Sequence, residues 1–171
     1  MALAQYLAGR GIGIVYGGAR LGLMGKVAEA ALQAGGEVIG VMPQALVDKE
    51  IAYQALADLR IVGSMHERKA QMAQLSDAFL ALPGGYGTFE ELCEVLTWTQ
   101  LGLQRKACGI LNVGGYYDAL LSLFDHAVAE QFLKPVHREI VIADSDPERL
   151  VRRVMEFEPP LVNKWIDMQG S

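Results

Sequence analysis

The sequence predicts an α/β fold in which a parallel sheet is doubly wound, with helices on both of its faces. Two observations support this fold class: short apolar runs alternate with amphipathic stretches, and turn-forming residues separate them. The 171 residues are enough for one domain with a substantial core, so we expect a single domain across residues 1–171. No internal repeat, linker or low-complexity segment interrupts the pattern.

The elements follow one another in regular order along the chain. Strands are expected over residues 12–16, 38–42, 59–62, 78–82, 107–111 and 139–142. Helices are expected over residues 3–9, 24–34, 88–100, 116–130 and 146–157, and a further helix runs through residues 70–75 with Arg68 and Lys69 in its first turn. The last helix has the clearest start, because Asp146 can serve as N-cap with Pro147 at the first helical position.

The most informative segment is the glycine-rich run from Pro83 to Glu91, which follows an apolar strand and opens a helix. Backbone N–H groups at a helix start are unpaired and carry the positive end of the helix dipole, and glycines let a phosphate approach them. The dinucleotide fingerprint is incomplete, because Glu90 stands where its third glycine belongs, and the Walker pattern lacks its Gly-Lys-Ser/Thr. We therefore expect one phosphate beside a carboxylate. The structural alternative is a capping box of Thr88 and Glu91, which needs no ligand.

A second cluster, Ser64-Met65-His66-Glu67-Arg68-Lys69, stands between a strand and a helix. It is expected to place two cations in the first helical turn, where they oppose the dipole unless an anion compensates. Arg68 shares a helical stripe with Met72 and Leu75, so it points toward the apolar side. The alternative is an arginine that covers core surface or pairs with a neighbouring acid.

Both clusters follow strands, and parallel strands bring their carboxyl ends to one edge of the sheet. Together the two motifs closely resemble the LONELY GUY (LOG) family of nucleoside 5′-monophosphate phosphoribohydrolases. The resemblance continues in residues 16–25, 38–43 and 97–102, and so covers most of the chain.

The resemblance implies a Rossmann-like nucleotide-binding hydrolase domain that cleaves the N-glycosidic bond of purine nucleoside 5′-monophosphates. The substrate would be AMP, a cytokinin riboside 5′-monophosphate or both, and the products a free base and ribose 5-phosphate. It also implies Arg68 and Glu91 as the catalytic pair. The implied substrate contacts are Glu50, Lys69, Gly84, Gly85, Tyr86, Gly87, Thr88, Glu90 and Thr97, of which Glu50 and Thr97 rest on alignment position alone.

A second glycine turn, from Gly17 to Gly25, follows the first expected strand at the same sheet edge. Gly18 is therefore a further candidate for contact with the nucleotide. The structural alternative is close packing of a strand against a helix, where small residues let two backbones approach.

The chemistry of the reaction agrees with the roles implied for the catalytic pair. Cleaving a sugar–base bond develops positive charge on the ribose, and the Glu91 carboxylate can stabilise that charge or activate the attacking water. Arg68 can neutralise the phosphate or orient Glu91, since both tasks suit a planar, permanently charged fork.

The composition argues against several classes of binding partner. The net charge of −5 and the lack of a basic patch argue against nucleic acid. No apolar run approaches the ~20 residues that span a bilayer and no export signal is visible, so a cytoplasmic protein is expected. We expect Cys93 and Cys108 to be buried free thiols. The three histidines are scattered, so we expect neither a metal nor another cofactor.

Self-association and two rival functions also follow from the resemblance. Members of the family are typically homodimers, and the helix over residues 88–100 is apolar around much of its circumference. A non-catalytic nucleotide or molybdenum-cofactor carrier is the main rival, although a carrier needs no carboxylate at the sugar. The label lysine decarboxylase has often been attached to the family, but we find no Schiff-base constellation for a pyridine cofactor.

One departure from the family concerns the first helix. Family members usually carry an additional strand and a Cys-Gly-Ser-like loop before the helix that is here expected over residues 3–9. The first strand of a doubly wound sheet is usually central, so its loss would leave a gap in the core, remove part of the nucleotide pocket and expose unpaired flanking strands. We expect either that the true start lies upstream, or that the fold closes differently, by rearranged pairing or by borrowing from another subunit.

Overall fold

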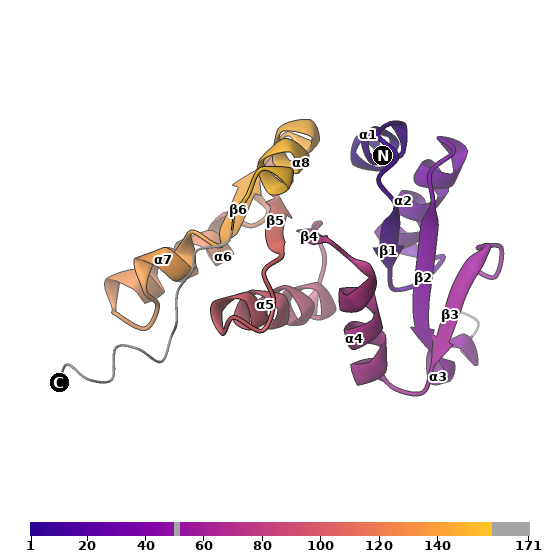
Figure 1. Cartoon of the computed structure of the whole chain (residues 1–171), viewed down its shortest axis with the longest axis horizontal. Coiled ribbons are helices and arrows are strands. Elements are labelled where there is room, and N and C mark those ends of the chain that lie inside the picture. The colour runs from indigo at the N-terminus through magenta and orange to yellow at the C-terminus, as the bar shows by residue number, and fades with distance from the viewer. Residues whose placement is uncertain (50–51, 159–171) are drawn as a thin grey trace. The chain divides into compact units, whose positions relative to one another are not determined.

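A computed structural model describes residues 1–49 and 52–158 of the chain (Figure 1). The chain divides into two compact units, Met1–Ser76 and Asp77–Ser171, and each is described by itself. Every strand pairing within a sheet is parallel, and helices alternate with the strands in both units. The predicted α/β class with parallel sheets is confirmed.

The first unit is built on a three-stranded sheet. Its elements are α1 (Ala2–Gly9), β1 (Ile14–Tyr16), α2 (Gly22–Gln33), β2 (Val38–Pro43), α3 (Gln44–Val47), β3 (Asp58–Val62) and α4 (Met65–Leu75). The strand order is β1-β2-β3, with Ile14 paired to Val38 and Ile39 paired to Asp58. The sheet therefore ends at β1 on one side.

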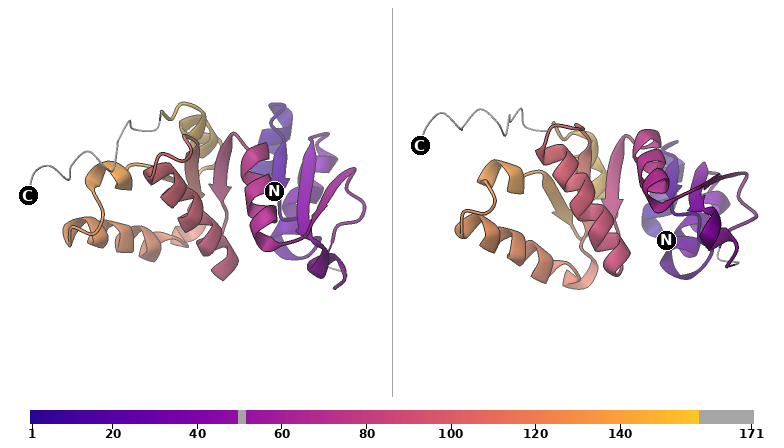
Figure 2. Two further views of the ribbon diagram at one scale, coloured as in Figure 1. Left: turned by 60° about the horizontal axis from the view of Figure 1, so that its bottom comes forward. Right: turned by 90° about the horizontal axis from the view of Figure 1, so that it is seen from below.

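Side chains of the first sheet alternate between two helical layers. Tyr16 packs with Ala28 of α2 and with Val38 in an apolar cluster that α1 also joins. Successive residues of an extended chain point to opposite faces. The next residue, Gly17, therefore faces the opposite side, and a β-carbon added to it would point at Arg68 of α4. Helix α4 packs against all three strands. Helices α1 and α2 thus cover one face, and α4 covers the other (Figure 2).

The second unit repeats this plan. Its elements are β4 (Ala78–Ala81), α5 (Tyr86–Gln100), β5 (Ala107–Leu111), the 3-10 turn η1 (Val113–Gly115), α6 (Asp118–Ala129), α7 (Pro135–Arg138), β6 (Val141–Asp144) and α8 (Pro147–Met155). The strand order is β4-β5-β6. Ile110 packs with Leu92 of α5, whereas the neighbouring Gly109 faces Leu150 and Val154 of α8. Helices therefore cover both faces of this sheet as well.

Most expected elements agree with the structure to within two residues, and two of the differences have a clear local cause. Asp146 caps α8 as expected, because its carboxylate accepts a hydrogen bond of 2.7 Å from the backbone N–H of Arg149. The last strand was wrongly placed over residues 139–142: it is Val141–Asp144, because the short helix α7 and its turn occupy the residues before it. The helix expected from Thr88 begins two residues earlier, at Tyr86.

The described strands form two separate three-stranded sheets, with β1 and β4 each at one end of their sheet. That the chain lacks the family's first strand stays a prediction, as does the single domain across residues 1–171. Among the described residues, no helix has the length and apolar character to span a membrane.

Candidate functional site

Helix α4 begins with two hydrogen bonds that involve Glu67. The N-cap Ser64 accepts a bond of 3.1 Å from the backbone N–H of Glu67, and the Glu67 carboxylate accepts one of 2.7 Å from the N–H of Gly63. The spacing Ser64-x-x-Glu67 could have revealed this start from sequence, although Glu67 bonds to the residue before the N-cap and not, as in a standard capping box, to the N-cap itself. Arg68 is thus the fourth helical residue and Lys69 the fifth, so the two cations lie at or beyond the end of the first turn in which they were expected. The charged residue within the first turn is Glu67, whose negative charge interacts favourably with the helix dipole.

The guanidinium of Arg68 lies against the carboxyl ends of β1 and β2. Its Nε donates a hydrogen bond of 3.2 Å to the carbonyl of Val41, which is in β2. The group also lies over Gly17, the residue that directly follows β1, where an added β-carbon would be 2.1 Å from Nη2. The side chain is half-buried, as its helical phase predicted. In parallel sheets this edge is where ligands bind.

Gly18 has a backbone role that accounts for the glycine. Its φ is +74°, a region that other residues rarely adopt, and an added β-carbon would be 3.1 Å from Leu59 and 3.3 Å from Met42. Its carbonyl accepts a hydrogen bond of 2.8 Å from the N–H of Tyr53. These contacts give Gly18 a structural role, but with strands β2 and β3 rather than with a helix as the alternative had it, and contact of Gly18 with a nucleotide stays a prediction.

The glycine loop of the second unit leads directly into α5, and no side chain caps that helix. Gly85 is the N-cap, and Thr88 is the third helical residue. The alternative of a capping box from Thr88 and Glu91 is therefore wrong, because Gly85 takes the N-cap position and the helix starts earlier. The Thr88 hydroxyl instead covers Gly84, where an added β-carbon would lie 2.2 Å from it. The N–H groups of the first turn are left without a side-chain cap, as an anion-binding helix start requires.

The outer surface of this loop is open. Gly85, Tyr86 and Gly87 are exposed, and Tyr86 is 92% exposed. A β-carbon added to Gly85 or Gly87 would meet nothing within 4 Å, and neither glycine has a positive φ. Neither packing nor backbone conformation therefore requires glycine at these two positions, and their small size leaves the surface of the loop open.

Two tyrosines hold the same loop from its inner side. The Tyr117 hydroxyl donates a hydrogen bond of 2.5 Å to the carbonyl of Leu82, and the Tyr116 hydroxyl donates one of 2.5 Å to the carbonyl of Gly84. Asn112, just after β5, accepts a bond of 2.7 Å from the N–H of Tyr117. Burial, and to a lesser extent Tyr116, raise the pKa of Tyr117 to about 12, so its hydroxyl stays protonated as a donor.

The acidic residues of α5 lie on two different stripes. Glu91 is half-buried and shares its stripe with Thr88 and the buried Val95, at i−3 and i+4. Glu90 and Thr97 lie on the neighbouring exposed stripe, and the Thr97 hydroxyl donates a bond of 2.7 Å to the carbonyl of Cys93. The structure thus groups Thr88 with Glu91, and Thr97 with Glu90.

The predicted site residues are divided between the units. Gly18, Arg68 and Lys69 belong to the first, whereas the glycine loop, Glu90, Glu91 and Thr97 belong to the second. The pairing of Arg68 with Glu91 stays a prediction. Glu50 lies outside the described residues.

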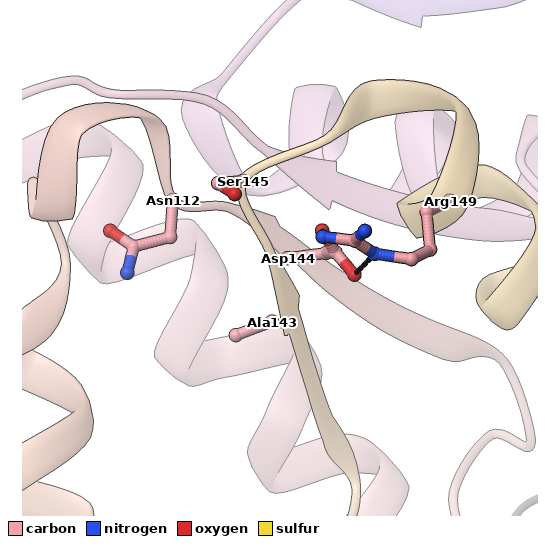
Figure 3. Close-up of a pocket in the computed structure, with 5 residues that line it drawn as sticks. All are labelled: Asn112, Ala143, Asp144, Ser145 and Arg149. Carbon is pink, nitrogen blue, oxygen red and sulfur yellow. Dashed lines mark hydrogen bonds and ion pairs between the residues drawn. The ribbon is translucent and has the colours of Figure 1, made fainter.

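A shallow cavity of about 290 Å³ lies at the carboxyl ends of β5 and β6 (Figure 3). It is lined by Asn112, Ala143, Asp144, Ser145 and Arg149, and it contains no residue predicted for the site. Asp144 receives two hydrogen bonds from Arg149 and one of 2.9 Å from the N–H of Asp146. Hydrogen bonding by Arg149 holds the pKa of Asp144 well below its usual range. The arrangement ties α8 to the sheet.

The two cysteines differ in their exposure. Both cysteines are free, as predicted, and Cys108 is buried. Cys93 is exposed, so its predicted burial is wrong; it lies on the exposed stripe of α5 between Glu90 and Thr97. Within residues 1–49 and 52–158, no three His, Cys, Asp or Glu side chains are grouped to hold a metal ion.

Comparisons with known proteins find close relatives. A family model described as "Possible lysine decarboxylase" matches residues 24–154. A probable cytokinin riboside 5′-monophosphate phosphoribohydrolase of Oryza sativa subsp. japonica is 52% identical over 157 residues, which are 92% of this chain and 69% of the relative. A cytokinin riboside 5′-monophosphate phosphoribohydrolase of Arabidopsis thaliana is 48% identical over 157 residues, covering 92% and 72%.

Among solved structures, the chain resembles the molybdenum cofactor binding protein from the phototrophic bacterium Rippkaea orientalis. The TM-score is 0.66 at 22% sequence identity, over 90% of this chain and 82% of the other. At that identity the likeness concerns the fold alone.

Proposed function

The chain belongs to the LOG family, and we propose that it hydrolyses the N-glycosidic bond of purine nucleoside 5′-monophosphates to a free base and ribose 5-phosphate. The observation that carries this proposal is the start of α5. There an open glycine loop leads into helical N–H groups without a side-chain cap, and the half-buried Glu91 follows on the same helix.

The glycine loop binds the phosphate of the substrate in this proposal. The first-turn N–H groups of α5 donate to the phosphate oxygens, and the helix dipole favours the negative charge. Gly85 and Gly87 leave the approach open, because neither carries a β-carbon there. Lys69, Thr88 and the exposed Glu90 and Thr97 are the further substrate contacts that we assign.

Glu91 acts at the ribose. It lies about one turn beyond Thr88, so a nucleotide held by its phosphate at the helix start directs its sugar along this stripe. The carboxylate stabilises the oxocarbenium-like centre or activates the attacking water. General-base help is typically ~10²–10⁴-fold, so a Glu91→Gln variant is expected to lose at least 100-fold in turnover.

Arg68 provides the fixed cation. Its Nε is engaged with the Val41 carbonyl, which orients the fork at the sheet edge. We assign it to neutralise the phosphate or to orient Glu91, and lysine is expected to be a poor substitute because it lacks the planar fork. We further propose a cytoplasmic homodimer that binds neither nucleic acid nor membrane.

Product analysis tests the reaction. The purified protein is incubated with AMP and with N6-isopentenyladenosine 5′-monophosphate, and free base and ribose 5-phosphate are followed by chromatography. Release of both products in equal amounts supports the proposal, and the ratio of the two rates gives the base preference. Saturable binding without release would support a carrier instead, and release of carbon dioxide from lysine would support the decarboxylase label.

A further inference from the structure

Gly17 lies unusually close to the side chain of Arg68. It is buried, it directly follows β1, and a β-carbon built on it would lie 2.1 Å from Nη2 and 3.1 Å from Cζ of Arg68. Ordinary contact begins at 3.4 Å. The flat guanidinium therefore occupies the space that any other residue at this position would fill.

The backbone of Gly17 does not itself demand glycine. Its φ is not positive, unlike that of the neighbouring Gly18, so its conformation is open to L-residues. The nearest atoms to an added β-carbon all belong to the Arg68 side chain, at 2.1, 3.1 and 3.5 Å. The space around Gly17 is thus shaped for one side chain.

We propose that Gly17 is a positioning residue for Arg68. Because Gly17 has no β-carbon, the guanidinium can occupy the space over it while Nε is held by the Val41 carbonyl. This inference rests on the role proposed above for Arg68. The carbonyl fixes the guanidinium through Nε, and Gly17 lets Nη2 lie flat at the carboxyl end of β1. A group held on two sides keeps one orientation, as a preorganised charge must.

A Gly17→Ala variant is expected to fold, because the atoms in the way are the far end of a flexible side chain and not backbone. To reach ordinary contact, Nη2 must move out by about 1.3 Å. Misplacement of about 1 Å can cost 10²-fold in rate, so we expect kcat/KM to fall by roughly 100-fold with little change in the unfolding midpoint.

Gly13 offers a matched control in the same unit. A β-carbon there would meet only Glu37, at 3.6 Å or more, and the φ of Gly13 is not positive. Gly13→Ala is therefore expected to leave both activity and stability unchanged. Gly25→Ala is the opposite control, because its β-carbon would lie 1.9 Å from the backbone oxygen of Arg20, and it should lower stability.

A double-mutant cycle with Arg68→Ala shows whether Gly17 acts through Arg68. We expect the Gly17→Ala change to cost nothing further once the arginine is absent. Added guanidinium at a sub-denaturing concentration should restore part of the activity of Arg68→Ala when Gly17 is intact, but not when Gly17→Ala is also present. A merely structural role for Gly17 would not produce that difference.

A readout without substrate separates this inference from the proposed function. The Arg68 Nε–H resonance should report the hydrogen bond to Val41 in the wild type and should shift in Gly17→Ala but not in Gly13→Ala. An unshifted resonance, or full activity of Gly17→Ala beside an inactive Arg68→Ala, would overturn the positioning role alone. Full activity of Arg68→Ala would overturn the role assigned to Arg68 and, with it, this inference.

Discussion

Replacing Tyr117 with phenylalanine tests whether the glycine loop is held from its inner side. The change removes the hydroxyl that donates to the Leu82 carbonyl at 2.5 Å and keeps the ring. That ring is 1% exposed and packs edge-on against Tyr116 and Phe89, with centroids 5.0 and 6.1 Å away. Packing is therefore retained, and only the hydrogen bond is lost.

The expected magnitude follows from the surroundings of that bond. A neutral hydrogen bond contributes about 0.5–1.5 kcal/mol, and an acceptor left without a partner costs about 1–3 kcal/mol. Leu82 is half-buried, so water partly replaces the lost donor and the lower part of the range applies. We expect Tyr117→Phe to lower the unfolding free energy by about 1–2 kcal/mol, a 5–30-fold change in the folding equilibrium. Nucleotide affinity should fall by no more than the same factor.

Urea unfolding and calorimetric titration with AMP measure the two effects. Tyr16→Phe is the matched control, because the Tyr16 hydroxyl is buried and has no hydrogen-bond partner within the described residues. Removing it should leave stability unchanged or raise it. If Tyr117→Phe matched the wild type in both stability and AMP affinity, the tyrosine would not hold the loop.

Three further predictions concern other parts of the molecule. Gly87→Ala should keep or raise stability, because its β-carbon meets nothing within 4 Å, while calorimetry should show weaker AMP binding; unchanged affinity would place the phosphate elsewhere. Asp144→Asn should destabilise at pH 7, because Arg149 lowers the pKa of Asp144 in the folded protein; the difference should begin to shrink as the pH falls below about 4 and should vanish only when the pH falls through that lowered pKa, so urea unfolding from pH 7 to pH 3 should show a partial decrease, and a difference that stays constant or grows would contradict it. Cys93 should react with a thiol reagent in the native protein and Cys108 only after unfolding, and equal rates would contradict their burial.

The sequence predicted what depends on local pattern. Apolar runs located all six strands to within two residues, and Asp146 with Pro147 located the start of α8, because strand and cap signals act over a few residues. The last strand was displaced because a four-residue helix such as α7 has too little periodicity to be seen.

The start of α5 shows where local pattern fails. Thr88 and Glu91 match a capping box, but the preceding Gly85 takes the N-cap position, and the Thr88 hydroxyl covers Gly84 instead. Two matching residues cannot decide between N-cap positions that lie three residues apart. In the structure the N-cap is Gly85, so the first turn of α5 has no side-chain cap.

The supports of the candidate site could not be predicted, because they depend on contacts between distant segments. Tyr117 and Leu82 are 35 residues apart, and Arg68 and Val41 are 27 residues apart. The exposure of Cys93 also follows from which face of α5 packs on the sheet, and that face is set by the tertiary fold.

Turnover and binding of AMP, measured on the same samples of wild type and Glu91→Gln, test the central claim most directly. The account predicts that the variant binds AMP with nearly wild-type affinity through the glycine loop, while release of adenine and ribose 5-phosphate falls at least 100-fold. A Glu91→Gln variant that releases both products at the wild-type rate would contradict it, because the carboxylate would then take no part in breaking the bond.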